Sequence, residues 1–201
     1  MSDSVNQFMA LPGRLLLDTC IINLLQDEDE YLWEGILPEN ITEEELDPDL
    51  KALRNIFIVN ERASFQLVIS PLTIAEVANV QDFSVRERKV RWVLDVLDTW
   101  LITVDDLMDR EGQGGTVRAR FKLTPKLQEL ESQLMTIKDF QRDPFDRLLL
   151  LQYQMANCDA FLTVDINTIW KHREKLSSLG IRVIRPSEFW NLIQPWARLW
   201  M

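Results

Sequence analysis

Short apolar segments alternate with longer amphipathic stretches along this chain, and this alternation restricts the fold more than any other feature. Strands that alternate with helices are typical of βαβ units, whose strands are parallel. Continuous apolar cores such as Leu15 to Leu17 fit strands that are buried on both faces. Five apolar segments bounded by polar residues are strand candidates: 14–18, 66–70, 101–105, 160–165 and 181–186. The sequence therefore predicts an α/β fold with a mostly parallel sheet.

The stretches between these segments carry boundary residues of helices. Ser70 followed by proline predicts a helix over 71–80, because Ser caps helices and proline is favoured at the first helical position. Asp143 followed by proline predicts a helix over 144–157 in the same way. Three further helices are predicted: 85–98 capped by Ser84, 166–178 opened by Asp165, and 188–200 opened by Ser187.

The length of 201 residues fits one domain, and 46% hydrophobic residues exclude global disorder. We therefore expect a single domain over 1–201. Two segments fit the alternation poorly and are predicted to be insertions: an acidic one at about 27–49 and a basic one at about 112–125.

Targeting signals are not evident in the sequence. No apolar run approaches the ~18 residues that span a bilayer, and the first residues lack the basic and apolar regions of a secretory signal. Two Cys cannot build a disulfide framework. We expect a cytoplasmic protein without membrane association.

The net charge of −10 argues against nucleic-acid binding when it is taken as an average, because phosphate backbones favour positive surface. Its distribution weakens that argument. Residues 27–49 contain 11 acidic residues and no Lys or Arg, whereas the rest of the chain contains 21 acidic and 22 basic residues. We interpret the segment either as a solvated acidic loop or as an acidic surface for a basic partner or for the protein's own basic patch.

Asp18 and Asp165 lie at the carboxyl ends of two predicted strands. In an open parallel sheet, ligands bind beyond these ends, so both side chains are expected at one edge. Each is also suited to cap the helix that follows, which is a common role of Asp. Spacing alone leaves both roles open.

Two further acids lie on predicted helices that begin at the same edge. Glu76 shares a polar stripe with Thr73 and Asn79 on an otherwise apolar helix, and this stripe faces either water or a polar cleft. Asp146 is the third residue of its helix, where the helix dipole favours an acid by roughly 0.3–1 kcal/mol. That position is equally suited to face a cleft at the start of the helix.

Convergence of these four carboxylates would call for a cation. At a separation of about 4 Å and an effective dielectric near 20, each pair repels by roughly 4 kcal/mol. Oxygen ligands select the hard ions Mg²⁺ or Mn²⁺, and one His with two Cys excludes a Cys/His zinc site. Such ions activate water for phosphodiester hydrolysis. The sequence therefore makes Mg²⁺ or Mn²⁺ the expected cofactor if the four acids converge.

Three segments, in this order, resemble the signature segments of PIN-domain nucleases: LLLDTCIINLL, SPLTIAEVANV and DPFDRLLLLQYQMANCDAFLTVD. The family has an Asp after the first strand, a Glu in a following helix, an Asp opening a later helix, and a T-x-D after the next strand. These positions match Asp18, Glu76, Asp146 and Asp165, with Thr163 as the threonine. The resemblance covers somewhat under half of the chain.

The resemblance implies a three-layer fold with a roughly five-stranded parallel sheet, and a metal-dependent endoribonuclease. Asp18, Glu76, Asp146 and Asp165 would then hold Mg²⁺ or Mn²⁺, and Thr163 would orient Asp165 or a water molecule. Many proteins of this family are toxins of bacterial toxin–antitoxin pairs. RNA is therefore the expected substrate, and an antitoxin-like protein is the partner that the resemblance suggests.

The basic segment offers a candidate RNA contact. In a strand, Arg118, Arg120 and Lys122 would lie on one face and apolar residues on the other. We interpret this pattern either as a basic arm for an RNA backbone or as an ordinary amphipathic edge strand.

The surroundings of the signature segments leave other functions open. The Trp residues near the C-terminus either pack onto the sheet or form a homodimer or partner surface. The alternative function is a non-catalytic PIN-like protein-interaction module, and a more distant one is a small-molecule phosphohydrolase.

Overall fold

The computed structural model describes residues 10–60, 62–63, 65–79, 81–99, 102–103 and 124–199, with the backbone alone at 96–99 and 102–103. Its strands are β1 (Arg14–Leu17), β2 (Gln66–Ile69), β3 (Ile102–Thr103), β4 (Ala160–Leu162) and β5 (Val183–Ile184). They pair in parallel in the order β3-β2-β1-β4-β5, with the two-residue β3 at one edge. The predicted α/β class with a parallel sheet is confirmed. The predicted basic arm, with Arg118, Arg120 and Lys122, lies outside the described residues.

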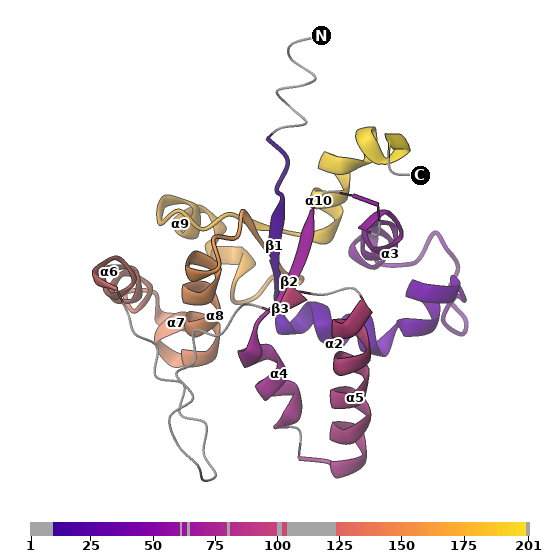
Figure 1. Ribbon diagram of the computed structural model, residues 1–201, viewed down its shortest axis with the longest axis horizontal. Coiled ribbons are helices and arrows are strands. Elements are labelled where there is room, and N and C mark those ends of the chain that lie inside the picture. The colour runs from indigo at the N-terminus through magenta and orange to yellow at the C-terminus, as the bar shows by residue number, and fades with distance from the viewer. Residues whose placement is uncertain are drawn as a thin grey trace.

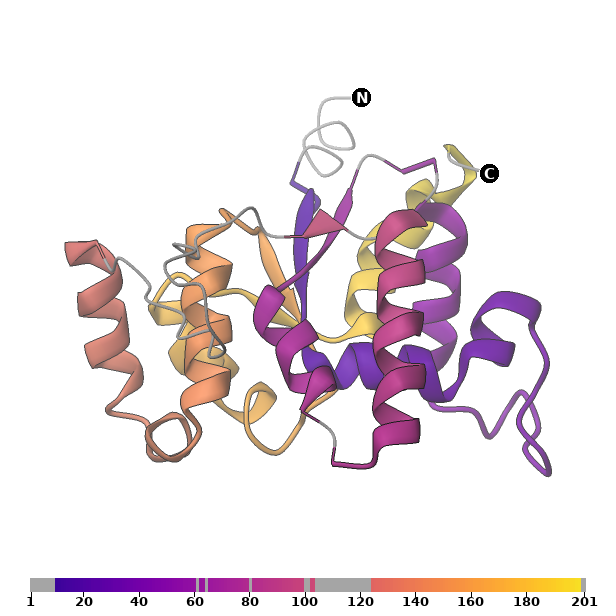
Figure 2. The ribbon, with the colours of Figure 1, turned by 60° about the horizontal axis from the view of Figure 1, so that its bottom comes forward.

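Helices cover both faces of the sheet (Figures 1 and 2). The α-helices are α2 (Thr19–Asp27), α3 (Pro48–Asn60), α4 (Pro71–Ala78), α5 (Phe83–Thr99), α6 (Pro125–Leu134), α7 (Lys138–Arg142), α8 (Pro144–Met155), α9 (Arg173–Ser178) and α10 (Pro186–Ile193). Short helical turns are η1 (Glu30–Glu34), η2 (Trp170–His172) and η3 (Gln194–Leu199). Figure 2 shows α3, α5 and α10 on one side of the sheet and α6 and α8 on the other.

The central strand β1 explains this layering. Successive side chains of a strand point to opposite faces of the sheet. Leu15 and Leu17 pack into one hydrophobic cluster with α2, α3 and α10, and Leu16 packs into a second cluster with α6, α7 and α8. All three leucines are fully buried. The apolar run that identified this strand in the sequence therefore supplies both cores.

Helix starts agree with local sequence signals in two cases. The Ser70 hydroxyl accepts a hydrogen bond from the Leu72 amide at the start of α4. The Asp143 carboxylate accepts from the amides of Phe145 and Asp146 at the start of α8. Both predicted caps are confirmed.

Three predicted helix starts were wrong. The helix predicted over 166–178 begins only at Arg173, as α9, after the turn η2. Asp82, rather than Ser84, caps α5, because its carboxylate accepts hydrogen bonds from the amides of Ser84 and Val85. Helix α10 begins at Pro186 instead of after Ser187, with the Glu188 carboxylate accepting from the Arg185 amide. For α5 and α10 the observed N-terminal contact lies two residues before the predicted cap.

The acidic segment is anchored in the fold at both ends. Tyr31, Leu32 and Leu46 are buried in the cluster that also contains α3. Asp49 is 1% exposed and contacts Arg185 and the Ser187 amide. Residues 39–45 between these anchors are exposed. The interpretation as a solvated loop therefore holds only for the middle of the segment.

None of the helices within the described ranges is both long enough and apolar enough to cross a membrane.

Candidate functional site

The sheet register brings the ends of three strands together. Leu17, the last residue of β1, is aligned with Ile69 of β2 and with Leu162 of β4. The next residue in each chain segment is polar: Asp18, Ser70 and Thr163 respectively. These three residues therefore leave the sheet side by side, at the edge where α2 and α4 begin (Figure 1).

Asp18 is 4% exposed and occupies the N-cap position of α2, but its side chain makes no capping hydrogen bond. Its Oδ2 atom instead accepts a 2.6 Å hydrogen bond from the Thr163 hydroxyl and a 2.9 Å hydrogen bond from the Cys20 thiol. The spacing left open whether Asp18 caps the following helix or lies at the sheet edge as a site residue. The Asp18 carboxylate contacts the sheet edge and makes no capping hydrogen bond. Burial is the main cause that raises the pKa of this carboxyl, and the nearby charge of Asp165 raises it further.

Asp165 combines a turn contact with a position at this edge. Its Oδ1 accepts hydrogen bonds from the amides of Asn167 and Thr168, which stabilise the turn after β4. Its own amide donates to the Thr163 hydroxyl at 2.9 Å. Thr163 therefore links Asp165 to Asp18, as a bridging hydroxyl between the two strand ends.

Glu76 approaches from α4. Its carboxylate is hydrogen-bonded to Thr19, and the Thr19 hydroxyl lies 3.3 Å from that of Thr73, which is fully buried. Thr73 of the polar stripe thus faces the start of α2, whereas Glu76 and Asn79 keep exposed surface. Partial burial is the main cause that raises the pKa of Glu76, with smaller effects from the charges of Asp18 and Asp143.

Asp146 is a second carboxyl at this edge whose pKa is strongly raised. Its pKa is raised to about 7, first by burial and then by the negative charges of four other carboxylates: Asp143, Asp18, Asp165 and Glu76. All three of the other predicted ligands therefore lie within electrostatic reach of Asp146. The four acids that the sequence singled out converge on one region.

The donor set at this edge suits a hard cation, because it consists of carboxylate oxygens whose mutual repulsion is expressed in the pKa of Asp146. The side chains are not drawn tightly together, however. Within the part of the chain that the structure describes, no three His, Cys, Asp or Glu side chains are placed closely enough to hold a metal ion as they stand. A cation would have to draw these carboxylates inward.

Sequence reasoning missed two residues that contact this site. Cys20 is half-buried, and its thiol donates to Asp18. Burial raises the pKa of this thiol well above its usual range, so the thiol keeps its proton and acts as a donor. Thr19, which contacts Glu76, was also missed. The available signal was their position directly after Asp18, in the first turn of a helix.

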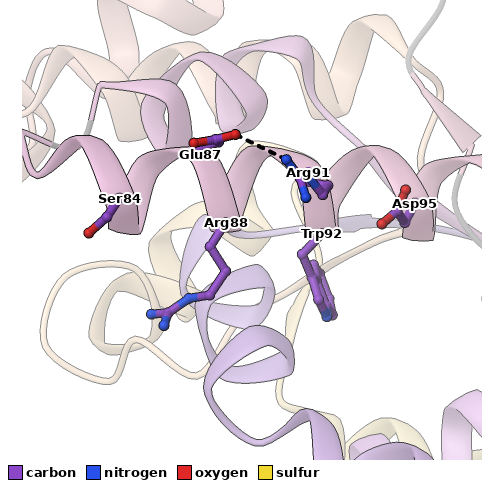
Figure 3. Close-up of a pocket in the computed structure, with 6 residues that line it drawn as sticks. All are labelled: Ser84, Glu87, Arg88, Arg91, Trp92 and Asp95. Atoms are coloured by element: carbon purple, nitrogen blue, oxygen red, sulfur yellow. Dashed lines mark hydrogen bonds and ion pairs between the residues drawn. The ribbon is translucent and has the colours of Figure 1, made fainter.

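A separate hollow of about 430 Å³ lies along α5 and contains none of the predicted ligands. Figure 3 shows Arg88 and Trp92 pointing to one side of the helix, while Glu87 and Arg91 form an ion pair of 3.0 Å on another. The hollow is also lined by Ser84 and Asp95. The two arginines are balanced by two carboxylates, so this hollow has no net charge that would select an anion.

No protein-family model and no curated protein matches the chain. A fold class alone does not determine function. Function is therefore inferred from the chemistry of the residues at the carboxyl end of the sheet.

Proposed function

We propose that the protein is a PIN-like endoribonuclease that uses Mg²⁺ or Mn²⁺ to hydrolyse phosphodiester bonds in RNA. One observation carries this proposal: burial, and after it the negative charges of Asp143, Asp18, Asp165 and Glu76, raise the pKa of Asp146 to about 7. Folded proteins seldom gather like charges without a compensating partner, and perturbed pKa values cluster at functional sites.

Asp18, Glu76, Asp146 and Asp165 would hold the cation. When bound, a divalent cation polarises a phosphate oxygen and offsets the charge that develops during hydrolysis. The chain's own residues prepare this site: Thr163 holds Asp18 and Asp165 together, and Thr19 holds Glu76. The ordered sequence segments that resemble PIN-domain nucleases support the same assignment and suggest RNA as the substrate.

The biological role that this resemblance suggests is that of a toxin opposed by an antitoxin-like protein. Expression of the wild-type chain in a bacterial host should then arrest growth, whereas the Asp146→Asn variant should not. Normal growth with the wild-type chain at equal expression would argue against a toxin and leave the nuclease chemistry to the enzymatic test.

That test compares cleavage of a labelled single-stranded RNA by the wild type, Asp18→Asn and Asp146→Asn in the presence of MnCl₂. Both substitutions remove a charge while keeping the shape of the side chain, and each should reduce the rate by about 10²-fold or more if the carboxylate is a ligand. Glu129→Gln, on the outer helix α6, is the matched control and should cut RNA like the wild type.

Three outcomes would contradict the assignment. Equal cleavage by all variants would show that another residue or a contaminant is responsible. Turnover of a phosphomonoester without RNA cleavage would indicate a small-molecule phosphohydrolase. Absence of both Mn²⁺ binding and cleavage would favour the non-catalytic interaction module.

A further inference from the structure

The thiol of Cys20 contacts one of the carboxylates at the sheet edge. Its sulfur lies 2.9 Å from Oδ2 of Asp18, the same oxygen that accepts the Thr163 hydrogen bond. We propose that Cys20 is a positioning residue: its thiol and the Thr163 hydroxyl together hold the Asp18 carboxylate in the orientation that a bound cation requires. This inference rests on the proposed function.

The hydrogen bonds around Asp18 form one consistent chain of donors. The Val164 amide donates to the Cys20 sulfur at 3.4 Å, and the thiol donates to Asp18. In parallel, the Asp165 amide donates to the Thr163 hydroxyl, which donates to Asp18. Each proton is used once, and both paths begin in the backbone of the turn after β4. The Asp18 carboxylate is therefore held from two sides by the same turn.

The geometry of the first turn of α2 gives Cys20 this access. Asp18 is the N-cap, and residue 20 is the second residue of the helix, close enough for its side chain to reach back over the cap. The sulfur also lies 3.3 Å from the Thr163 hydroxyl, so the thiol fills the space between the two oxygen atoms and the start of the helix. Two donors on one oxygen restrict rotation of the carboxylate plane, as outer contacts of metal ligands commonly do.

The second cysteine lies away from the four carboxylates, and its thiol contacts Arg14 rather than an acid at this edge. Cys158 is 8% exposed and packs in the apolar cluster beneath α8, on the other face of the sheet. Substitution of both cysteines by alanine removes the same atoms in two environments. Cys158→Ala is therefore the matched control for Cys20→Ala.

The experiment measures Mn²⁺ binding by titration calorimetry for the wild type, Asp18→Asn, Cys20→Ala, Cys20→Ser and Cys158→Ala. Cys20→Ala should bind Mn²⁺ about 10-fold to 100-fold more weakly than the wild type, the usual effect of removing an outer contact of a metal ligand. Cys20→Ser keeps a donor and should stay within about threefold of the wild type, since hydroxyl and thiol can both donate to a carboxylate. Cys158→Ala should bind Mn²⁺ like the wild type.

RNA cleavage by the same variants gives a second readout. Loss of orientation at Asp18 should lower kcat of Cys20→Ala with little change in KM, because the thiol contacts Asp18, whose proposed role is to hold the cation rather than the RNA. Circular dichroism and thermal melting establish that each variant is folded before it is compared.

The outcomes separate this inference from the function on which it rests. If the wild type binds Mn²⁺ and Asp18→Asn does not, the proposed metal site stands. Unchanged Mn²⁺ affinity in folded Cys20→Ala would then overturn only the positioning role, as would equal weakening in Cys158→Ala or failure of serine to restore binding. If the wild type itself binds no Mn²⁺, the metal-dependent function and the positioning role are both overturned.

Discussion

The Thr163 hydroxyl donates a 2.6 Å hydrogen bond to Oδ2 of Asp18, across 145 residues of sequence and between the ends of two paired strands. Both residues are buried, with Thr163 fully inaccessible to solvent. This bond fixes the position of one strand end relative to the other. It also makes Thr163 the simplest residue through which to test the site without removing a carboxylate.

Thr163→Val should lower the free energy of unfolding by about 1–3 kcal/mol, because it keeps the shape of the side chain but leaves a buried carboxylate short of a donor. Thr163→Ser retains the hydroxyl and should recover most of this loss apart from that of the methyl group. Urea unfolding monitored by circular dichroism measures both. Equal stability of the valine variant and the wild type would show that the bond adds nothing to folding.

Asp146→Asn should stabilise the metal-free protein at high pH. The pKa of Asp146 is about 7 in the folded state against an ordinary value of 3.8, so the folded protein binds a proton that the unfolded chain releases between these values. The associated stabilisation is present at low pH and is lost as the pH rises to about 7.

Because Asp146 is partly exposed and solvent screens its neighbours, we expect the asparagine variant to gain about 1–2 kcal/mol over the wild type at pH 8. The gain should be much smaller at about pH 4, where the carboxyl is protonated in the folded state and partly so in the unfolded chain. Urea unfolding in EDTA at the two pH values measures the difference, with Glu129→Gln as the control. A gain that does not change with pH would contradict the assigned cause.

Mn²⁺ should stabilise the wild type more at pH 8 than at pH 6, because a proton on Asp146 competes with the cation. A ligand at 100 times its Kd stabilises a folded protein by about 2.7 kcal/mol, so the shift in Tm is readily measured. Asp18→Asn should lose the Mn²⁺-dependent shift at both pH values. An equal shift in this variant would place the bound ion elsewhere.

Arg185→Ala should destabilise the protein by about 3 kcal/mol or more, because it leaves the buried carboxylate of Asp49 without its charged partner. The Arg185 guanidinium contacts Asp49 Oδ2, with Nε at 2.7 Å, and the Ser187 amide contacts Oδ1 at 2.9 Å. Urea unfolding measures the loss, and Arg182→Ala, on an exposed position of the same segment, is the control. If Asp49→Asn in the Arg185→Ala background recovers no stability, the unpaired charge is not the cause.

Local features of the fold could be predicted from the sequence, because their causes lie within a few residues. The cap at Ser70 and the cap at Asp143 each depend on a side chain and an amide two residues away. The same short range explains the wrong start of α5, since Asp82 and Ser84 lie two residues apart and both residue types cap helices. Hydrophobic pattern alone does not decide between them.

The site itself could be predicted in part. Resemblance in three segments singled out Asp18, Glu76, Asp146 and Asp165, and the structure brings the other three within electrostatic reach of Asp146. The contacts that orient them could not be predicted, because each joins distant parts of the chain. The thiol of Cys20 meets the turn after β4, and Asp49 of the acidic segment meets Arg185 across 136 residues.

The strand order has a consequence for how the protein matures. Strand β1 lies between β2, which follows it closely along the chain, and β4, which is synthesised much later. A nascent chain that ends before β4 can pair β1 with β2, but it lacks the turn that holds Asp18. Closure of so long a loop is slow compared with local helix formation. The carboxylates therefore come together only after most of the chain has been synthesised, and no translation product that ends before Asp165 can carry the assembled centre.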